Sequence, residues 1–206
     1  MFVDVSLPIQ QGAVFRLGSP PVEIMKHSFF HESEGEYRST TISFPAHTAT
    51  HIDLVSEERS VDPERMIGRG KMIDVTHTSG CEIQLGDVEH QVDIESGDFV
   101  FFRTDWSKHI GTQEYFEHPE LTVDVVQWLI SKNINMTGID ALGLGQGRRH
   151  GEYDRVLTRN NIFVVENLTN LSAIPQNVFK VYCFPLKIEQ IEAIPARVVV
   201  EIDRHG

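Results

Sequence analysis

The chain has 206 residues, of which 40% are hydrophobic and 23% are charged, a composition typical of one globular domain with a sizeable core. The net charge of −12, from 18 basic and 30 acidic residues, argues against nucleic-acid binding, because no basic stripe is present. No run approaches the roughly 20 apolar residues of a membrane span, and the N-terminus lacks the pattern of a signal peptide. We therefore expect a single domain over residues 1–206, cytoplasmic and without a membrane partner.

The first part of the chain is rich in β-strand patterns. Alternating apolar and polar residues predict a strand over 1–8, and a loop rich in glycine and proline follows over 9–22. Phe15 lies in this loop and is a candidate wall of a substrate pocket. Two further strands are predicted over 22–31 and 37–44, joined by a polar turn.

The second of these strands leads into a stretch that carries His47, His51 and Asp53 within seven residues. Imidazole and carboxylate together suit zinc, manganese or iron. In a flat strand the two histidines would lie about 13 Å apart, and in a helix Asp53 would point elsewhere. A bend through residues 48–50 would bring His47 back towards the other two, which face the same way on an extended segment. The alternative interpretation is a pair of polar histidines near a strand end.

Strands and helices alternate through the rest of the chain, which indicates one mixed α/β domain. The predicted elements are one or two helical turns over 60–68, a strand over 71–76, a strand over 97–104 buried on both faces, a helix over 122–132 capped by Thr122, a strand over 134–140, a flexible loop over 143–151, a helix over 152–159, and strands over 162–166, 178–185 and 196–202.

Two carboxylates extend the candidate chemistry. Glu166 ends an apolar strand and needs a cation, a metal or backbone donors as a partner. Asp154 lies twelve residues earlier, so the two could supply oxygen ligands to a second ion. Asp140 also ends an apolar strand, but we favour a role as a cap of the following turn. The sequence has no GxSxG nucleophile elbow, so a metal-activated water is the more economical nucleophile.

In these motifs the chain resembles, nearly from end to end, the metal-dependent cyclase/hydrolase family that includes bacterial kynurenine formamidase and isatin hydrolase. The resemblance implies a swivelling β/β/α fold, with a mixed sheet and flanking helices, that assembles into a homodimer or homotetramer. It also implies hydrolysis of a small amide, formamide or lactam at a divalent metal centre of one or two ions. The segments that carry the resemblance are 4–8, 47–53, 102–106, 137–142, 165–171, 185–187 and 194–197.

The resemblance assigns a role to each candidate residue. His47, His51 and Asp53 match the ligands of the first ion, and Asp53 would bridge to a second ion where one is present. Glu166 matches the glutamate of the second site. Phe15 is the nearest candidate for the aromatic residue that lines the family's pocket.

The departures from the family pattern shift the site towards carboxylates. Ala49 stands where the family has glycine, and Val55 and Glu57 replace a proline and the histidine that shuttles protons. Asp154 replaces the second-site histidine, with His150 as a second candidate for this ligand. Oxygen-rich ligation favours manganese or magnesium over zinc, and Glu57 could act as a general base.

Three functions follow from these observations. The first is a metal-dependent hydrolase of a small amide, formamide or lactam, with Glu57 as the base. The second is an altered family member that binds a small molecule without hydrolysing it, because the shuttle histidine is missing. The third is a cyclase or dehydratase in a biosynthetic reaction.

Overall fold

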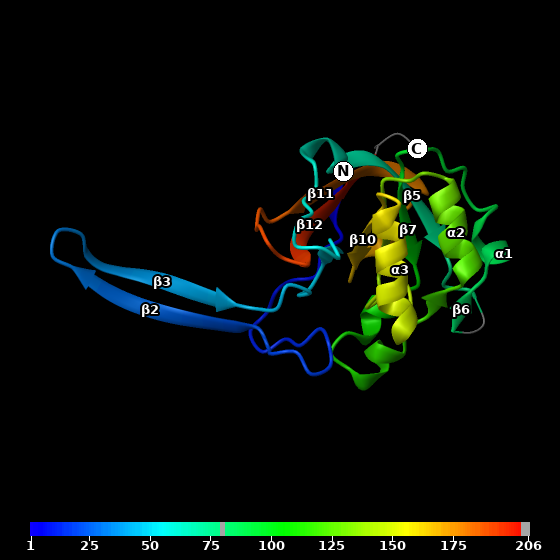
Figure 1. Ribbon diagram of the computed structural model, residues 1–206. Coiled ribbons are helices and arrows are strands. Elements are labelled where there is room, and N and C mark those ends of the chain that lie inside the picture. The colour runs from blue at the N-terminus through cyan, green and yellow to red at the C-terminus, as the bar shows by residue number, and fades with distance from the viewer. Residues whose placement is uncertain (79–80, 203–206) are drawn as a thin grey trace.

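The computed structural model describes residues 1–78 and 81–202 and is built around one large mixed sheet (Figure 1). The central strands β5, β7, β9 and β10 run parallel, and the remaining strands pair antiparallel. The spatial order is β1 (Phe2–Asp4), β12 (Ala193–Glu201), β11 (Val178–Pro185), β5 (Ile67–Asp74), β7 (Phe99–Arg103), β9 (Met136–Ile139), β10 (Phe163–Glu166) and β4 (His51–Asp53).

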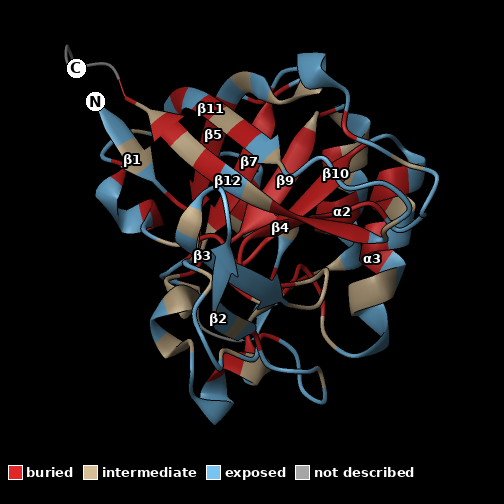
Figure 2. Ribbon diagram, turned by 90° about the vertical axis from the view of Figure 1, so that its left-hand side faces the viewer, coloured by how far each residue is buried: buried red, intermediate tan, exposed pale blue. Residues whose placement is uncertain are grey.

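The sheet closes on itself because the first part of β12 also pairs with β4. Short strand β4 is therefore bonded on both edges, with Ile52 opposite Val165 on one side and Ile194 on the other. All three residues of β4 are buried. This closure holds the histidine segment in the middle of the fold, as the burial colours show (Figure 2).

Helices cover one side of the sheet, α1 (Leu85–Val88), α2 (Val123–Ser131) and α3 (Arg148–Arg159). Strand β7 shows how the sheet separates two cores, because alternate side chains point to opposite faces. Phe99 and Phe101 belong to the core on the face away from the helices, whereas Phe102 packs with residues of α2 and α3. The prediction that this strand is buried on both faces is confirmed.

Two small sheets complete the structure. Strands β2 (Glu23–His31) and β3 (Gly35–Ser43) form a hairpin that projects from the body (Figure 1). Strands β6 (Glu82–Ile83) and β8 (Glu120–Leu121) pair in parallel. Short 3-10 helices occupy Pro63–Arg65, Trp106–His109, Gln113–Glu117 and Leu171–Ala173. None of the helices in the described part of the chain has the length and apolar character that a membrane span requires.

The mixed α/β architecture confirms the predicted fold class, and the structure corrects several local predictions. The first strand spans only Phe2–Asp4 of the predicted 1–8, and β5 runs over Ile67–Asp74 rather than 71–76. Helix α3 begins at Arg148, so residues 148–151 are not a loop, because buried Tyr153 and Leu157 anchor this glycine-containing segment against the core. The last strand begins at Ala193 rather than at 196. Thr122 precedes α2, but its hydroxyl makes no capping hydrogen bond.

Candidate metal centre

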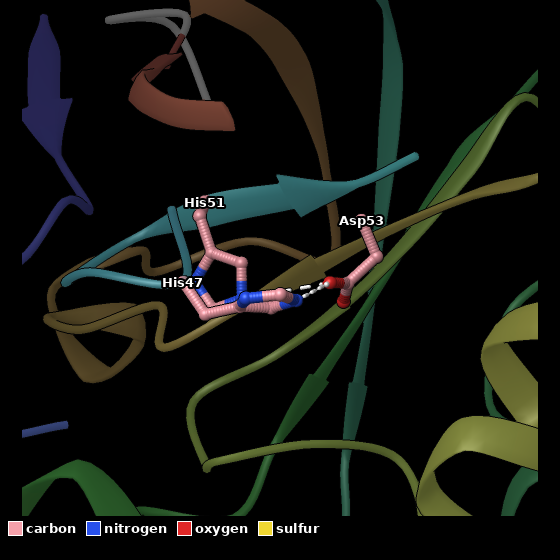
Figure 3. A group of neighbouring side chains, drawn as sticks. All are labelled: His47, His51 and Asp53. Atoms are coloured by element: carbon pink, nitrogen blue, oxygen red, sulfur yellow. Dashed lines mark ion pairs between the residues drawn. The ribbon is translucent and has the colours of Figure 1, made fainter. Parts of the chain in front are cut away.

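The first group of candidate ligands comes from β4 and the bend before it. His51 and Asp53 are two residues apart on the strand and face the same side, and His47 reaches them from the bend (Figure 3). The His47 Nε2 atom lies 3.3 Å from Asp53 Oδ1, and the His51 Nε2 atom lies 3.7 Å from the same oxygen. The two imidazole rings meet edge to face with centroids 5.2 Å apart. The predicted bend is therefore confirmed.

The bend turns at Ala49, whose φ of 54° is in the left-handed region. Alanine is strained there by about 1–2 kcal/mol, and surrounding hydrogen bonds hold it in place. Its carbonyl accepts bonds from His51 Nδ1 at 2.9 Å and from Asn167 Nδ2 at 3.0 Å. Because Nδ1 of His51 donates this proton, Nε2 is the unprotonated nitrogen that faces the site.

The second group combines helix α3 with the end of β10. His150 and Asp154 lie one turn apart on the helix, and both meet Glu166. The His150 Nε2 atom is 3.8 Å from Asp154 Oδ2 and 3.7 Å from Glu166 Oε1. Gly143 permits this approach, because a Cβ there would lie 2.3 Å from His150 Nδ1. The sequence left His150 and Asp154 as alternatives, whereas the structure brings both of them to Glu166.

Glu166 joins the two groups. It stands directly opposite His51 in the β10–β4 pairing, and its Oε2 lies 3.3 Å from His51 Nε2 while its Oε1 faces His150. The ion pairs of Asp53 within 4 Å are with His47 and His51, so the observed link between the groups is Glu166. Among the residues that the structure describes, four buried atoms here have no hydrogen-bond partner: His51 Nε2, Asp53 Oδ2, Asp154 Oδ1 and Glu166 Oε1.

The electrostatics of these groups are dominated by buried carboxylates that lie close to one another. Burial, together with the negative charges of neighbouring carboxylates, raises the pKa of Glu166 well above its usual range and that of Asp154 to about 8. Burial lowers the pKa of His51 and of His150, so both imidazoles are neutral near pH 7. Burial works against ionisation of Asp53 as well, but the adjacent His47 and His51 lower its pKa. A cation among these groups would stabilise all three carboxylates.

A pocket of about 280 Å³ opens onto both groups. Two of its lining residues had no recognisable signal in the sequence. Arg16 brings a positive charge to the pocket wall, and buried His118 donates from Nδ1 to the Pro119 carbonyl at 2.9 Å, which leaves Nε2 for a ligand. Burial lowers the pKa of His118, so this imidazole is neutral near pH 7. The lining residues are Arg16, Leu17, His47, His51, Phe116, His118, Leu142, Gly145, Gln146, Gly147, His150 and Glu166.

The structure does not place the other predicted residues on this pocket wall. Glu57 is exposed in the turn after β4, and Phe15 is buried in a small cluster with Val22 and Ala49. Their catalytic and substrate-binding roles remain predictions. Asp140 does act as a cap, but of a different turn: it accepts bonds from Thr104 N, Thr104 Oγ1 and Asp105 N after the neighbouring strand β7.

Comparisons with known proteins find relatives that align with most of this chain. Isatin hydrolase of Roseibium aggregatum is 26% identical over 92% of this chain and 84% of its own length. A solved structure described as a potential metal-dependent hydrolase with cyclase activity is 27% identical, with a TM-score of 0.81 over 98% of this chain and 99% of the other. An isatin hydrolase bound to the product analogue thioisatinate shares the fold, with a TM-score of 0.83 at 22% identity over 98% and 92% of the two chains.

The sequence model of the Cyclase family matches residues 3–146, a range that includes the first ligand group and the pocket residues Arg16 and His118. The second group lies beyond this range and is tied to the first through the sheet pairing of Glu166 with His51. On the extent of this match, the chain belongs to the Cyclase family.

Proposed function

We propose that the protein is a metal-dependent hydrolase that cleaves the C–N bond of a small amide, formamide or lactam. The observation that carries the proposal is the convergence, among the described residues, of unpartnered buried ligand atoms from β4, α3 and β10, of which those of His51 and Glu166 belong to residues that line one open pocket. Buried polar atoms without partners are costly, so their clustering fits a cation-binding site better than a structural network.

The residues present fit one or two divalent ions. His47, His51 and Asp53 would hold the first ion, and His150, Asp154 and Glu166 the second. Because the second group has two carboxylates and one imidazole, we favour manganese there over zinc. When bound, such an ion supplies Lewis acidity, which lowers the pKa of water and polarises a carbonyl oxygen.

The side chains around the pocket supply the remaining requirements of amide hydrolysis. Hydrolysis of an amide yields a carboxylate, and Arg16 offers the guanidinium that would pair with it. The leaving nitrogen needs a proton, and the unprotonated Nε2 of His118 on the pocket wall would accept one from the attacking water as a general base and then pass it to that nitrogen. Glu57 is the second candidate for proton transfer, but only if the exposed turn that carries it moves towards the pocket.

The choice of a C–N bond is supported by one relative. The name of isatin hydrolase describes the opening of isatin, a cyclic amide, and this relative aligns with most of the chain. The pocket volume of about 280 Å³ suits a substrate of similar size, with one or two small rings.

The proposal is tested by metal analysis and a substrate panel on the same mildly purified protein. We expect at least one divalent ion per chain, and turnover of formanilide or lactam substrates after loading with manganese or zinc. His51→Ala should lose the bound metal and lower turnover by at least a hundredfold, because it removes a buried ligand. His90→Ala is the matched control, because this histidine is exposed and far from both ligand groups in sequence.

Three outcomes would decide against the proposal. Absence of a stoichiometric ion would favour a family member that binds a small molecule without hydrolysis. A loaded protein that accepts lactones but no amide or lactam would contradict the assignment of the C–N bond. A bound metal without hydrolysis of any panel member would favour a cyclase or dehydratase. Comparing Glu57→Gln with His118→Gln in the same assay identifies which side chain transfers the proton.

A further inference from the structure

Asn167 comes directly after β10, and each of its four polar groups has a hydrogen-bond partner. Its backbone N–H donates to the Ala141 carbonyl at 3.0 Å, and its carbonyl accepts a bond from Thr50 Oγ1 at 2.6 Å. Its side-chain Nδ2 donates to the Ala49 carbonyl at 3.0 Å, and its Oδ1 accepts a bond from the Tyr115 hydroxyl. Asn167 is fully buried, so water does not compete for these bonds.

Two of these bonds hold consecutive residues of the bend before β4. Ala49 is strained by its left-handed φ of 54°, and Thr50 leads directly into the strand. The Ala49 carbonyl also accepts the Nδ1 proton of His51 at 2.9 Å, so the position of this carbonyl sets the orientation of the ring. Asn167 therefore clamps the bend that presents the imidazoles of the first ligand group.

Tyr115 fixes the orientation of the Asn167 side chain. A side-chain amide can turn over, which exchanges its donor and its acceptor, and Nδ2 would then face away from Ala49. The Tyr115 hydroxyl favours the observed orientation because it donates to Oδ1. Burial, together with the negative charges of Glu166 and Asp140, raises the pKa of Tyr115, so the hydroxyl keeps its proton and remains a donor.

Tyr115 belongs to the segment that forms part of the pocket wall. It lies in the 3-10 helix Gln113–Glu117, its side chain is 3% exposed, and its carbonyl accepts a bond from Trp106 Nε1 at 3.2 Å. Phe116, the next residue, and His118 both line the pocket. The hydroxyl of Tyr115 therefore connects the pocket wall with the bend that carries the metal ligands.

We propose that Tyr115 and Asn167 are positioning residues that hold the ring of His51 in the orientation for binding an ion. They act through the Ala49 carbonyl, and neither belongs to the two ligand groups. Because Asn167 directly follows Glu166, the same clamp also fixes the second group relative to the first. The inference rests on the proposed function, since it concerns ligands of the first ion.

The first test measures the affinity of metal-free protein for manganese by calorimetry. Tyr115→Phe keeps the aromatic ring and removes only the hydroxyl, so Asn167 Oδ1 loses its donor. We expect the dissociation constant to rise about tenfold, which is typical when a hydrogen-bonded support of a metal ligand is removed. Thr50→Val removes the bond to the Asn167 carbonyl with little change of shape, and it should weaken binding in the same direction.

The second test examines His51 in the metal-free protein. Long-range ¹H–¹⁵N NMR spectra distinguish the two neutral tautomers of an imidazole, and His51→Ala identifies the signals of this ring. In the unmodified protein we expect a protonated Nδ1 and an unprotonated Nε2. In Tyr115→Phe the shifts of the two nitrogens should move towards each other, because a displaced Ala49 carbonyl no longer selects one tautomer.

Tyr182→Phe is the matched control. It also removes a tyrosine hydroxyl, which donates to Glu201 Oε2 at 2.6 Å, and it lies outside both ligand groups and the pocket. This variant should retain the affinity for manganese and the signals of His51. Circular dichroism checks that each variant is folded at the temperature of the measurements.

Several results would overturn the positioning role. One is a folded Tyr115→Phe with unchanged His51 signals or an unchanged affinity for manganese. Another is an equal loss of affinity in Tyr182→Phe, because the effect would then be one of general stability. If Tyr115→Phe does not fold, Thr50→Val is judged by the same two measurements. If the unmodified protein binds no divalent ion, the proposed function fails, and the NMR comparison alone decides on Tyr115 and Asn167.

Discussion

At the residue scale, the site illustrates which contacts a sequence encodes locally. His51 and Asp53 face the same side because they are two apart in a strand, and this rule was sufficient to predict their grouping. His150 and Asp154 converge because they are four apart on a helix, but the sequence placed His150 in a loop and so left the two as alternatives. The pairing of Glu166 with His51 depends on strand register between distant segments, which short motifs do not specify.

The raised pKa of Asp154 makes metal binding depend on pH. With its pKa at about 8, raised mainly by burial, Asp154 is mostly protonated at pH 6 and must release its proton to bind an ion. The apparent affinity for manganese should therefore increase between pH 6 and pH 8, with protons released from Asp154 and from Glu166, whose pKa is also raised by burial, as the ion binds at the second group. Calorimetry in two buffers of different ionisation enthalpy measures this release.

Asp154→Asn provides the comparison, because an amide cannot titrate. This variant should bind manganese more weakly at pH 8 and show a flatter pH profile. An affinity of the unmodified protein that is constant from pH 6 to pH 8 would contradict the prediction.

At the scale of elements, the amino-acid composition of the strands predicted where they lie, whereas the composition of the loops did not predict their conformation. The bounds of four strands, β2, β3, β7 and β11, were predicted to within two residues from their apolar and β-branched residues. The segment around β4 was harder, because its path depends on left-handed residues at Ala49 and Val55 rather than on local propensity. Neither residue type signals a positive φ, so the turn after β4 had no signature in the sequence.

Val55 gives a prediction about stability. Its φ of 65° is unfavourable for a β-branched residue, and its side chain is 38% exposed. Val55→Gly should relieve about 1–2 kcal/mol of strain, offset in part by the greater flexibility of unfolded glycine, for a net gain of about 0.5–1 kcal/mol. The midpoint of thermal unfolding should rise by roughly 1–4 °C.

Val178→Gly is the control, because Val178 is similarly exposed at 46% but lies in strand β11 with an ordinary backbone. This substitution should lower the midpoint, since glycine weakens a strand. A lower midpoint for Val55→Gly as well would show that the turn is not strained.

At the scale of the whole molecule, the class of fold followed from the order of elements, but the closure of the sheet did not. The succession of strands and helices indicated a single mixed α/β domain. Strands β12 and β4 are far apart in the sequence, and no local sequence pattern predicts that they pair. The sequence also predicted strands β2 and β3 without indicating that they project from the body of the molecule. An exposed strand and a covered strand can have the same pattern of apolar and polar residues.

The ligand groups connect separate parts of this fold, so metal should stabilise the whole domain. The candidate ligands come from the bend at His47, from β4, from α3 and from the end of β10. An ion at a hundred times its dissociation constant adds about 2.7 kcal/mol to the free energy of unfolding. Removing metal with a chelator should lower the unfolding midpoint by roughly 5–10 °C, and manganese should restore it. An unchanged midpoint in a scanning calorimeter would argue against an ion at these residues.

The closure of the sheet also has a consequence for synthesis on the ribosome. Every candidate ligand is translated before β12, yet β4 gains its second neighbour, and β1 its partner, only when residues 193–201 emerge. The two ends then meet, with the Met1 amino group 2.7 Å from the Ile202 carbonyl. A nascent chain can therefore assemble the parallel centre from β5 to β10 early, but it cannot enclose the histidines until residues 193–201 have emerged. An ion held by these ligands would be enclosed only after β12 has been made.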